Sequence, residues 1–445
     1  MWKLSIQLDV RYERTMKTLK FKSTSKITME HPSIYDVLVY DIETDSLDTN
    51  TARCVFFGAY SYKHGKYFIF HEDEHEDIQR LIDDHKVLVG FNNKEFDGPI
   101  MENITNQFDL TYKIVFDCMT VLYDFKRRRS NRETMIVVKG KTLQDSLPNR
   151  KLKTVCETLG FPVAKGDIDY EIFRKDTWTA EELEDIYSYL VKDVDITRRL
   201  FEFYIEYFEP YKEYVNEDNI RKFDYIRSSG GSYAYSAICN LAELEPEFED
   251  DYFKLQERPL NSGGFVLEPQ VPYAEGTVIY YDFSSLYPNL FIQCNLFSHS
   301  CDCCTEEEKW DGDGFFELQG KYCSKTQGKI ENVLLDIYKK RREYKKIGDP
   351  RQMALKLLLN TTYGIVSSPI FKNLYHKYTG GDCTAIGRKC IQYTRKRFEE
   401  HGCKVIYGDT DSVFVKIPDD MSVEESQKIA EKITEELQTH MPFSH

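Results

Sequence analysis

Two aspartates, Asp409 and Asp411, are separated by a single threonine in the C-terminal part of the chain. Short apolar segments, residues 404–408 and 412–417, stand on either side and predict a β-hairpin whose tip holds both carboxylates. Two anions this close repel each other unless a cation lies between them. The spacing is therefore typical of a divalent metal site, although an ordinary surface Gly-Asp turn has the same residues.

A pair of basic helices is predicted before this hairpin. Residues 332–346 form a strongly basic helix, residues 347–350 break it, and residues 351–362 begin a second helix. If the helices fold back on each other, Arg341 and Lys356 lie at the same height, roughly 11–12 Å from the turn. Such a pair could hold a triphosphate, with Arg341 as a fork and Lys356 as a point charge.

The first part of the chain holds a second set of acids, which follow apolar strands or lie on a long helix. Residues 35–44 and 87–90 are the predicted strands, and residues 180–209 are the helix. Carboxylate oxygens are the ligands that Mg²⁺ prefers, so convergent acids would hold two divalent ions for hydrolysis. The residues of this set are Asp41, Glu43, Asp97, Asp193 and, four residues before Asp193 on the same helical face, Tyr189.

Length, charge and cysteine content limit the class of protein. A chain of 445 residues is too long for one core, which predicts two or three domains. The net charge of −15 opposes phosphate binding, but residues 321–400 contain 18 Lys and Arg against 7 Asp and Glu, and residues 126–132 form another basic run. An apolar leader, a membrane-length segment and a secreted cysteine framework are lacking, so we expect a cytoplasmic protein with reduced thiols and no membrane partner.

Three segments, residues 279–288, 356–364 and 407–412, resemble motifs A, B and C of the family B DNA polymerases and occur in the same order. The acids of the first part resemble exonuclease motifs I, II and III of proofreading polymerases. The resemblance covers about residues 35–440 and includes all six motifs. It implies a polymerase of phage or viral origin, which would place it in the host cytoplasm.

The resemblance assigns roles to individual residues. In the polymerase site the catalytic residues would be Asp282, Asp409 and Asp411, with Asp282, the Phe283 carbonyl and Asp411 as metal ligands. In the exonuclease site Asp41, Glu43, Asp97 and Asp193 would bind metal, and Tyr189 would orient the attacking water. The nucleotide-binding residues would be Ser285, Leu286, Tyr287, Arg341, Lys356, Asn360 and Tyr363.

Two of these assignments have alternatives. Tyr287 resembles a steric gate that excludes a 2′ hydroxyl, but a plain core aromatic is the other interpretation. The predicted fingers are short, which leaves Arg342 as an alternative to Arg341.

The implied fold class is mixed α/β and multidomain. It combines a ribonuclease H-like exonuclease domain with a polymerase palm, an antiparallel sheet with helices, and short helical fingers. Residues 263–269 resemble the loop that links the two domains, although an ordinary Gly-Gly turn is equally compatible. The predicted division is a short N-terminal segment 1–33, an exonuclease domain 34–215, a connection 216–262, palm 263–328, fingers 329–364 and palm 365–445, with the thumb absent.

The expected function is template-directed addition of dNTPs to a primer 3′ end, with a proofreading 3′–5′ exonuclease. Each active site would use two Mg²⁺ ions, for which Mn²⁺ could substitute. The expected partners are primer–template DNA, dNTPs and a processivity factor. Two alternatives stay open: an exonuclease whose polymerase half only holds DNA, and a non-enzymatic replisome subunit.

The C-terminal segment suggests a split enzyme. The helix 422–439 is followed only by a few residues, whereas the family continues with a palm strand and a thumb. We therefore expect an N-terminal piece whose palm sheet has an unpaired edge beside the hairpin. A separate C-terminal polypeptide would add the missing strand there.

Four cysteines lie between the first two polymerase motifs. Cys301 and Cys304 form one Cys-x₂-Cys arm, and Cys303 and Cys323 are nearby, but no second arm follows. The sequence therefore favours reduced thiols over a zinc site.

Overall fold

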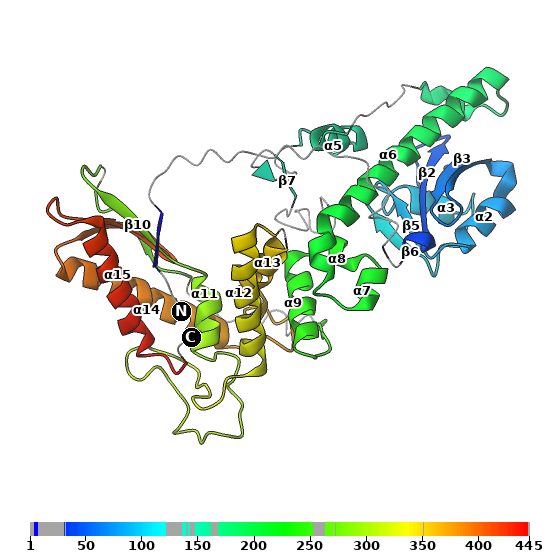
Figure 1. Cartoon of the computed structure of the whole chain (residues 1–445). Coiled ribbons are helices and arrows are strands. Elements are labelled where there is room, and N and C mark those ends of the chain that lie inside the picture. The colour runs from blue at the N-terminus through cyan, green and yellow to red at the C-terminus, as the bar shows by residue number, and fades with distance from the viewer. Residues whose placement is uncertain are drawn as a thin grey trace. The chain divides into compact units, whose positions relative to one another are not determined.

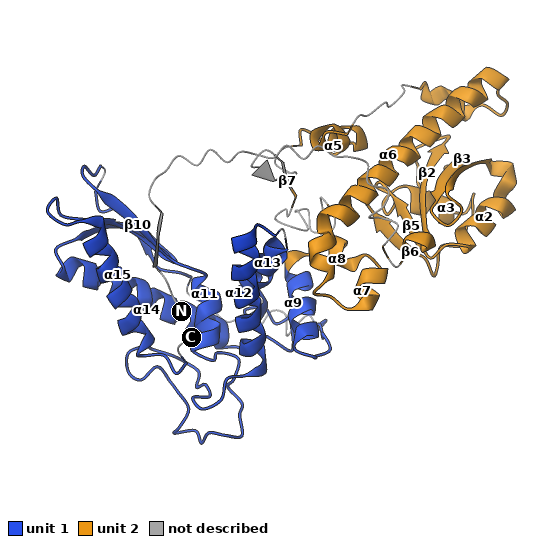
Figure 2. Ribbon diagram, in the orientation of Figure 1, with its two compact units in different colours: residues 1–14, 231–445 blue, residues 15–230 orange. Residues whose placement is uncertain are grey.

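The structure is a computed structural model that describes residues 4–7, 31, 33–121, 136–138, 141–142, 147–161, 168–251, 263–271, 273–349 and 351–443, with the backbone alone at 4–7, 137–138 and 141–142. The chain forms two compact units, residues 15–230 and residues 1–14 with 231–445 (Figures 1 and 2). The predicted basic run 126–132 lies outside the described residues. No helix in the described part of the chain has both the length and the apolar character needed to cross a bilayer.

The unit of residues 15–230 is built on a five-stranded sheet with the order β4-β3-β2-β5-β6. Strand β2 pairs antiparallel with β3 and parallel with β5, while β3–β4 is antiparallel and β5–β6 is parallel. The strands are β2 (Val37–Thr44), β3 (Cys54–Ser61), β4 (Lys66–His71), β5 (Val87–Gly90) and β6 (Ile114–Asp117).

Alternation along β2 separates core residues from acids. Leu38, Tyr40 and Ile42 enter a core with helices α2 (His75–Asp83) and α3 (Asp97–Glu102). Residues 41 and 43 point to the opposite face, which the long helix α6 (Ala180–Lys212) covers (Figure 1). The sequence alternation therefore directs the acids toward α6.

Helix α6 begins at a capping box and packs closely on the sheet. The Thr179 side chain accepts a hydrogen bond from the Glu182 amide, and Glu182 reaches back to the Thr179 amide. A Cβ added at Gly58 on β3 would lie only 2.4 Å from Leu190 Cγ. Glycine at this position lets α6 approach the sheet.

Short elements complete this unit. They are the 3₁₀ helices Ile34–Asp36, Glu72–Glu74 and Tyr170–Arg174, the strands β7 (Val137–Val138) and β8 (Lys141–Thr142), and the helices α5 (Leu152–Leu159), α7 (Glu217–Arg221) and α8 (Asp224–Arg227).

The other unit contains an antiparallel sheet with the order β1-β10-β12-β11-β9. Its central strands present the predicted catalytic acids, because Ser412 pairs with Asp282 on one side and with Asp409 on the other. The strands are β1 (Leu4–Gln7), β9 (Val266–Leu267), β10 (Val278–Phe283), β11 (Lys404–Asp409) and β12 (Ser412–Lys416).

The helices of this unit include the predicted basic pair, α12 and α13. Helix α14 packs against β11 and β12, and α12 packs along α13 (Figure 1). Helix α12 ends at Gly348, whose φ of +71° suits glycine. The helices are α9 (Gly230–Leu241), α11 (Leu286–Gln293), α12 (Lys329–Ile347), α13 (Gln352–Val366), α14 (Thr379–Glu400) and α15 (Val423–Gln438).

The expectation of an unpaired edge beside the hairpin is wrong. Strand β9 pairs with β11 at Gly408 and Asp409, and the Gln270 amide donates to the Ile406 carbonyl at 2.9 Å. On the other side, β10 separates the hairpin from β1, which comes from the predicted segment 1–33. The edge argument for a second polypeptide therefore has no support in this sheet.

Candidate functional site

Three acids from distant parts of the sequence meet between β2 and α6. Ligand oxygens of Asp41, Glu43 and Asp193 all lie within 4.8 Å of one another. Glu43 and Asp193 are each only 6% exposed, whereas Asp41 is partly exposed. Strand β2 presents the first two acids and α6 presents the third, which agrees with the predicted convergence.

Asp97 and Tyr189 border the same cavity but make other contacts. The cavity measures about 550 Å³ and is lined by all three acids together with Asp97 and Tyr189. The Asp97 carboxylate accepts a hydrogen bond from the Ile42 amide, and burial raises the pKa of Asp97 to about 7. Within the described residues, Asp97 lies outside the group of three acids.

Tyr189 is held by a tyrosine that the sequence did not indicate. The two hydroxyls of Tyr189 and Tyr170 are 3.1 Å apart. Burial raises the pKa of Tyr189, and the Tyr170 hydroxyl adds to this effect. The Tyr189 hydroxyl is therefore neutral at physiological pH.

Asp117 is a second buried acid, and its charge adds to the rise in the pKa of Asp97 that burial causes. It ends β6, is 0% exposed, and accepts backbone amides of Asn92 at 2.9 Å and Met119 at 2.8 Å. Burial raises the pKa of Asp117. Its position at a strand end was the only sequence signal for it.

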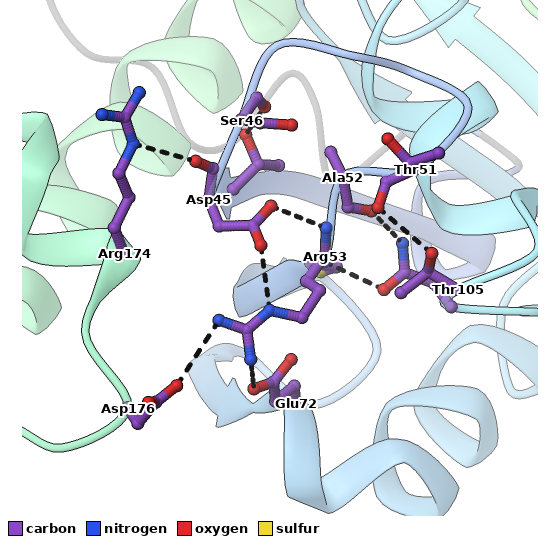
Figure 3. A network of polar contacts seen from close by, with 12 residues as sticks. Asp45, Ser46, Thr51, Ala52, Arg53, Glu72, Thr105, Arg174 and Asp176 are labelled. Carbon is purple, nitrogen blue, oxygen red and sulfur yellow. Dashed lines mark hydrogen bonds and ion pairs between the residues drawn. The ribbon is translucent and has the colours of Figure 1, made fainter.

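A polar network holds the loop that follows β2 (Figure 3). Arg53 binds the Asp45 carboxylate through its Nε at 2.9 Å and Glu72 through Nη1 at 3.0 Å. On the other side of the loop, Arg174 Nε donates to the Asp45 carbonyl at 3.2 Å. Because Asp45 lines the cavity, this network fixes one wall of the site.

In the other unit, three aspartates gather at the end of the central strands. The Phe283 amide donates to the Asp411 carbonyl at 2.8 Å, which joins β10 to the hairpin turn. Burial, the Asp282 carboxylate and the Asp409 carboxylate raise the pKa of Asp411 to about 6. Burial also raises the pKa of Asp282. Among the residues that the structure describes, these three aspartates do not form a group with all ligand atoms within 4.8 Å.

The turn after Asp282 meets the basic helix α12. Ser285 has a φ of +54° and precedes the first residue of α11, Leu286, whose side chain is buried. Arg341 Nη1 donates to Ser285 Oγ at 3.2 Å. Arg342 instead lies over the Tyr338 ring, 5.9 Å from its centroid. The structure therefore brings Arg341, and not Arg342, to the predicted nucleotide-binding turn.

The remaining predicted nucleotide-binding residues lie on α13 and α11. Lys356 and Asn360 are exposed, and their spacing from Tyr363 places all three on one face of α13. The Tyr287 ring on α11 lies 5.1 Å from the Tyr363 ring, centroid to centroid. The structure thus joins the two tyrosines, while Lys356 stands on the exposed surface.

The Gly263-Gly264 segment lies against the aspartate turn. The Phe265 carbonyl accepts the Thr410 amide at 2.9 Å, and Arg388 Nη1 donates to the Gly263 carbonyl at 3.0 Å. A Cβ at Gly264 would be 2.7 Å from Thr410 Oγ1. The segment is therefore packed at the site and is more than a surface turn.

Comparisons with known proteins agree with this architecture. Residues 249–444 match the model of DNA polymerase family B, and residues 38–205 match that of the RNase H superfamily. The predicted fold class is confirmed: an RNase H-like domain precedes a family B polymerase domain. The C-terminal part of the chain is thus similar to family B DNA polymerases, and the N-terminal part is similar to the RNase H superfamily.

Two similar curated proteins are archaeal DNA polymerases. DNA polymerase 1 of Pyrococcus abyssi (strain GE5 / Orsay) is 26% identical over 404 residues, which are 83% of this chain and 50% of that protein. The DNA polymerase of Archaeoglobus fulgidus is 26% identical over 373 residues, 80% of this chain and 45% of that protein. The chain thus spans about half the length of the curated relatives it matches.

Among solved structures, the family B DNA polymerase from the hyperthermophilic archaeon Pyrobaculum calidifontis is similar, with a TM-score of 0.49 and 20% identity over 90% of this chain and 55% of that chain.

Proposed function

We propose that this chain takes part in template-directed DNA synthesis, adding dNTPs to a primer 3′ end, and removes 3′ nucleotides at a second site. The observation that supports synthesis is the strand order β10-β12-β11, which collects Asp282, Asp409 and Asp411 beside the turn that Arg341 contacts. The grouping of Asp41, Glu43 and Asp193 supports the exonuclease.

In the proposed polymerase site, Asp282, the Phe283 carbonyl and Asp411 would hold Mg²⁺, and Asp409 would support them. The donor set fits this ion, because it consists of oxygen atoms. Bound Mg²⁺ would activate the primer 3′ hydroxyl and stabilise the departing pyrophosphate. Arg341 and Lys356 would bind phosphate oxygens, and Asn360 and Tyr363 would lie under the new base pair.

In the proposed exonuclease site, Asp41, Glu43 and Asp193 would hold divalent ions, and these cations would bind the phosphate. Asp97, whose carboxylate is bonded to the Ile42 amide, would join them only after turning toward the group. The buried Tyr189 hydroxyl would orient the attacking water, and Tyr170 would hold that hydroxyl in place. The cavity of about 550 Å³ suits a single-stranded 3′ end.

A second candidate function has one observation in its favour. The exonuclease acids form a compact group, whereas the polymerase aspartates of the described chain do not. This difference favours an exonuclease whose C-terminal unit binds DNA without extending it. We prefer synthesis because DNA binding alone requires neither the contact of Arg341 with the Ser285 turn nor the pairing of Tyr287 with Tyr363.

The experiment is a gel assay with the purified chain. A labelled primer–template with dNTPs and Mg²⁺ should be extended, and a labelled single strand without dNTPs should be shortened from its 3′ end. Excess chelator should stop both reactions. Trimming without extension would favour the second candidate, and neither reaction in a folded protein would contradict both.

Three parts of the sequence-based prediction have no support beyond the sequence. They are the viral origin, the separate C-terminal polypeptide and the processivity factor. The relatives reported above are archaeal. These three points stay predictions.

A further inference from the structure

Four cysteines meet in the segment that joins α11 to α12. Figure 1 shows the path of this segment between the two helices. Residues 294–328, all of which the structure describes, contain no helix, and an isolated bridge between Trp310 and Tyr322 folds the segment back on itself. This fold places Cys323 beside Cys301, Cys303 and Cys304. The Sγ atoms of the four cysteines all lie within 4.8 Å of one another.

The measured separations fit a tetrahedron around one ion. Cys323 Sγ lies 3.3 Å from Cys303 Sγ and 3.5 Å from Cys304 Sγ, and the last two are 3.8 Å apart. Four thiolates at a zinc–sulfur distance of about 2.3 Å stand about 3.8 Å apart in a regular tetrahedron. For Cys303, Cys304 and Cys323, binding would therefore need changes in separation of about 0.5 Å or less.

A disulfide explains this arrangement less well than a shared ion. A sulfur–sulfur bond is about 2.05 Å long and joins only two cysteines. All four thiols here are free, and three of their separations are similar to one another. Similar spacing among several thiols is what a common ligand requires.

The surroundings of the cluster suit thiolates. The Thr326 amide donates to Cys323 Sγ at 3.4 Å, and the Ser324 amide hydrogen-bonds to Cys304. The ammonium groups of Lys309 and Lys325 interact electrostatically with the cluster. Amide donors and nearby cations offset the negative charge of a zinc tetrathiolate.

The backbone of Cys323 is anchored to the end of α11. Its amide donates to the Ser298 carbonyl at 2.8 Å, and its carbonyl accepts the Asn295 side chain at 2.9 Å. Long segments without secondary structure are uncommon in compact domains and are usually either functional or disordered. The cluster is in the right place to hold this one.

We propose that this four-cysteine cluster binds one zinc ion with a structural role. Four thiolates leave no open position for water, which is typical of structural sites. Each thiol would release its proton to solvent on binding. The ion would fix residues 294–328 between α11, which follows the Ser285 turn, and α12, which presents Arg341.

The test is metal analysis of the full chain, expressed with added zinc and purified under reducing conditions without chelator. The wild-type protein should contain one zinc per chain by inductively coupled plasma mass spectrometry. Cys303→Ser and Cys323→Ser should each lose it. Cys303 is exposed, so this variant should keep the wild-type circular dichroism spectrum. Cys403→Ala, a thiol of the same unit outside the cluster, should keep its zinc.

A second measurement follows the ligand set directly. Cobalt(II) in place of zinc should give the visible absorption bands of a tetrahedral tetrathiolate, and chelation should lower the melting temperature of the wild type. Folded wild-type protein without zinc, zinc retained in both serine variants, or a disulfide among the four under reducing conditions would overturn the proposal. Iron in place of zinc would overturn the choice of ion.

Discussion

Tyr287 lies between two neighbours that restrict its ring. The Tyr363 ring is 5.1 Å away, centroid to centroid, and a Cβ added at Gly387 would lie 3.2 Å from Tyr287 Cε1. The ring therefore has little room to move toward α14. A wall that cannot move can exclude one hydroxyl group, whereas a mobile ring would give way.

Replacing Tyr287 with alanine should admit ribonucleotides. Removal of the ring leaves space for a 2′ hydroxyl, and dNTP incorporation should change little because the phosphate contacts remain. We expect discrimination between dATP and ATP to fall at least about tenfold, which corresponds to about 1.4 kcal/mol. Single-nucleotide extension measures it. Tyr287→Phe keeps the ring and should keep the discrimination. If the alanine variant discriminates between dATP and ATP as well as the wild type does, Tyr287 is not a steric gate.

Arg341 and Arg342 are neighbours in the sequence with different surroundings. Arg341 reaches Ser285 Oγ, while Arg342 lies over Tyr338. Arg341→Ala should raise the KM for dNTP by about 10-fold to 100-fold, because a hydrogen bond to a charged group contributes about 1.5–3 kcal/mol. Arg342→Ala is the matched control and should change KM by less than about threefold. The opposite ranking in steady-state extension kinetics would reverse the assignment.

At the scale of elements, the sequence predicted those with a long, regular pattern. Periodicity and breakers indicated β2, α6, the α12–α13 pair and the β11–β12 hairpin. The flanking strands β1 and β9 have four and two residues, too few to show a pattern. Tyr170 and Asp117 reach their sites only through tertiary contacts, so their types and spacing gave no adequate signal.

The close packing of β3 and α6 predicts that one substitution there lowers both the stability of the unit and its proposed exonuclease activity. A Cβ at Gly58 would lie 2.4 Å from Leu190 Cγ, so Gly58→Ala should push α6 and Asp193 away from β2. We expect a loss of about 1–3 kcal/mol of stability and much weaker trimming. Extension should be unchanged. The double variant Gly58→Ala with Leu190→Ala should lose less free energy of unfolding than the two single variants lose together. Strictly additive losses, measured by chemical unfolding, would contradict this contact.

Glu331 makes the start of α12 sensitive to pH. Its carboxylate is 0% exposed and accepts the Phe297 amide at 2.8 Å. Burial raises its pKa from 4.5 to about 7. Between these values the folded protein binds more protons than the unfolded chain, so the free energy of unfolding falls as pH rises.

Glu331→Gln should remove this part of the pH dependence. In the wild type, the free energy of unfolding begins to fall near pH 4.5. The fall is complete above pH 7, where it is on the order of 3 kcal/mol. Melting temperatures at pH 5 and pH 8 measure it: the wild type should drop more than the glutamine variant. Parallel pH profiles for the two proteins would show that Glu331 does not titrate in this range.

At the scale of the whole molecule, the chain has two compact units, and each holds its own set of acids. Asp41, Glu43 and Asp193 belong to residues 15–230, while Asp282, Asp409 and Asp411 belong to the other unit. The net charge of −15 hides a basic block at residues 321–400, which includes α12, α13 and α14. The proposal of two reactions in one chain therefore requires that the two acid sets act separately.

The most direct measurement is the assay of extension and trimming by two variants side by side. Asp282→Asn should abolish primer extension and leave 3′ trimming of a single strand unchanged. Asp41→Ala with Glu43→Ala should abolish trimming and leave extension unchanged. Each variant would be checked by circular dichroism for its fold. If either variant loses both activities while folded, or if neither loses its own, the assignment of two separate sites is contradicted.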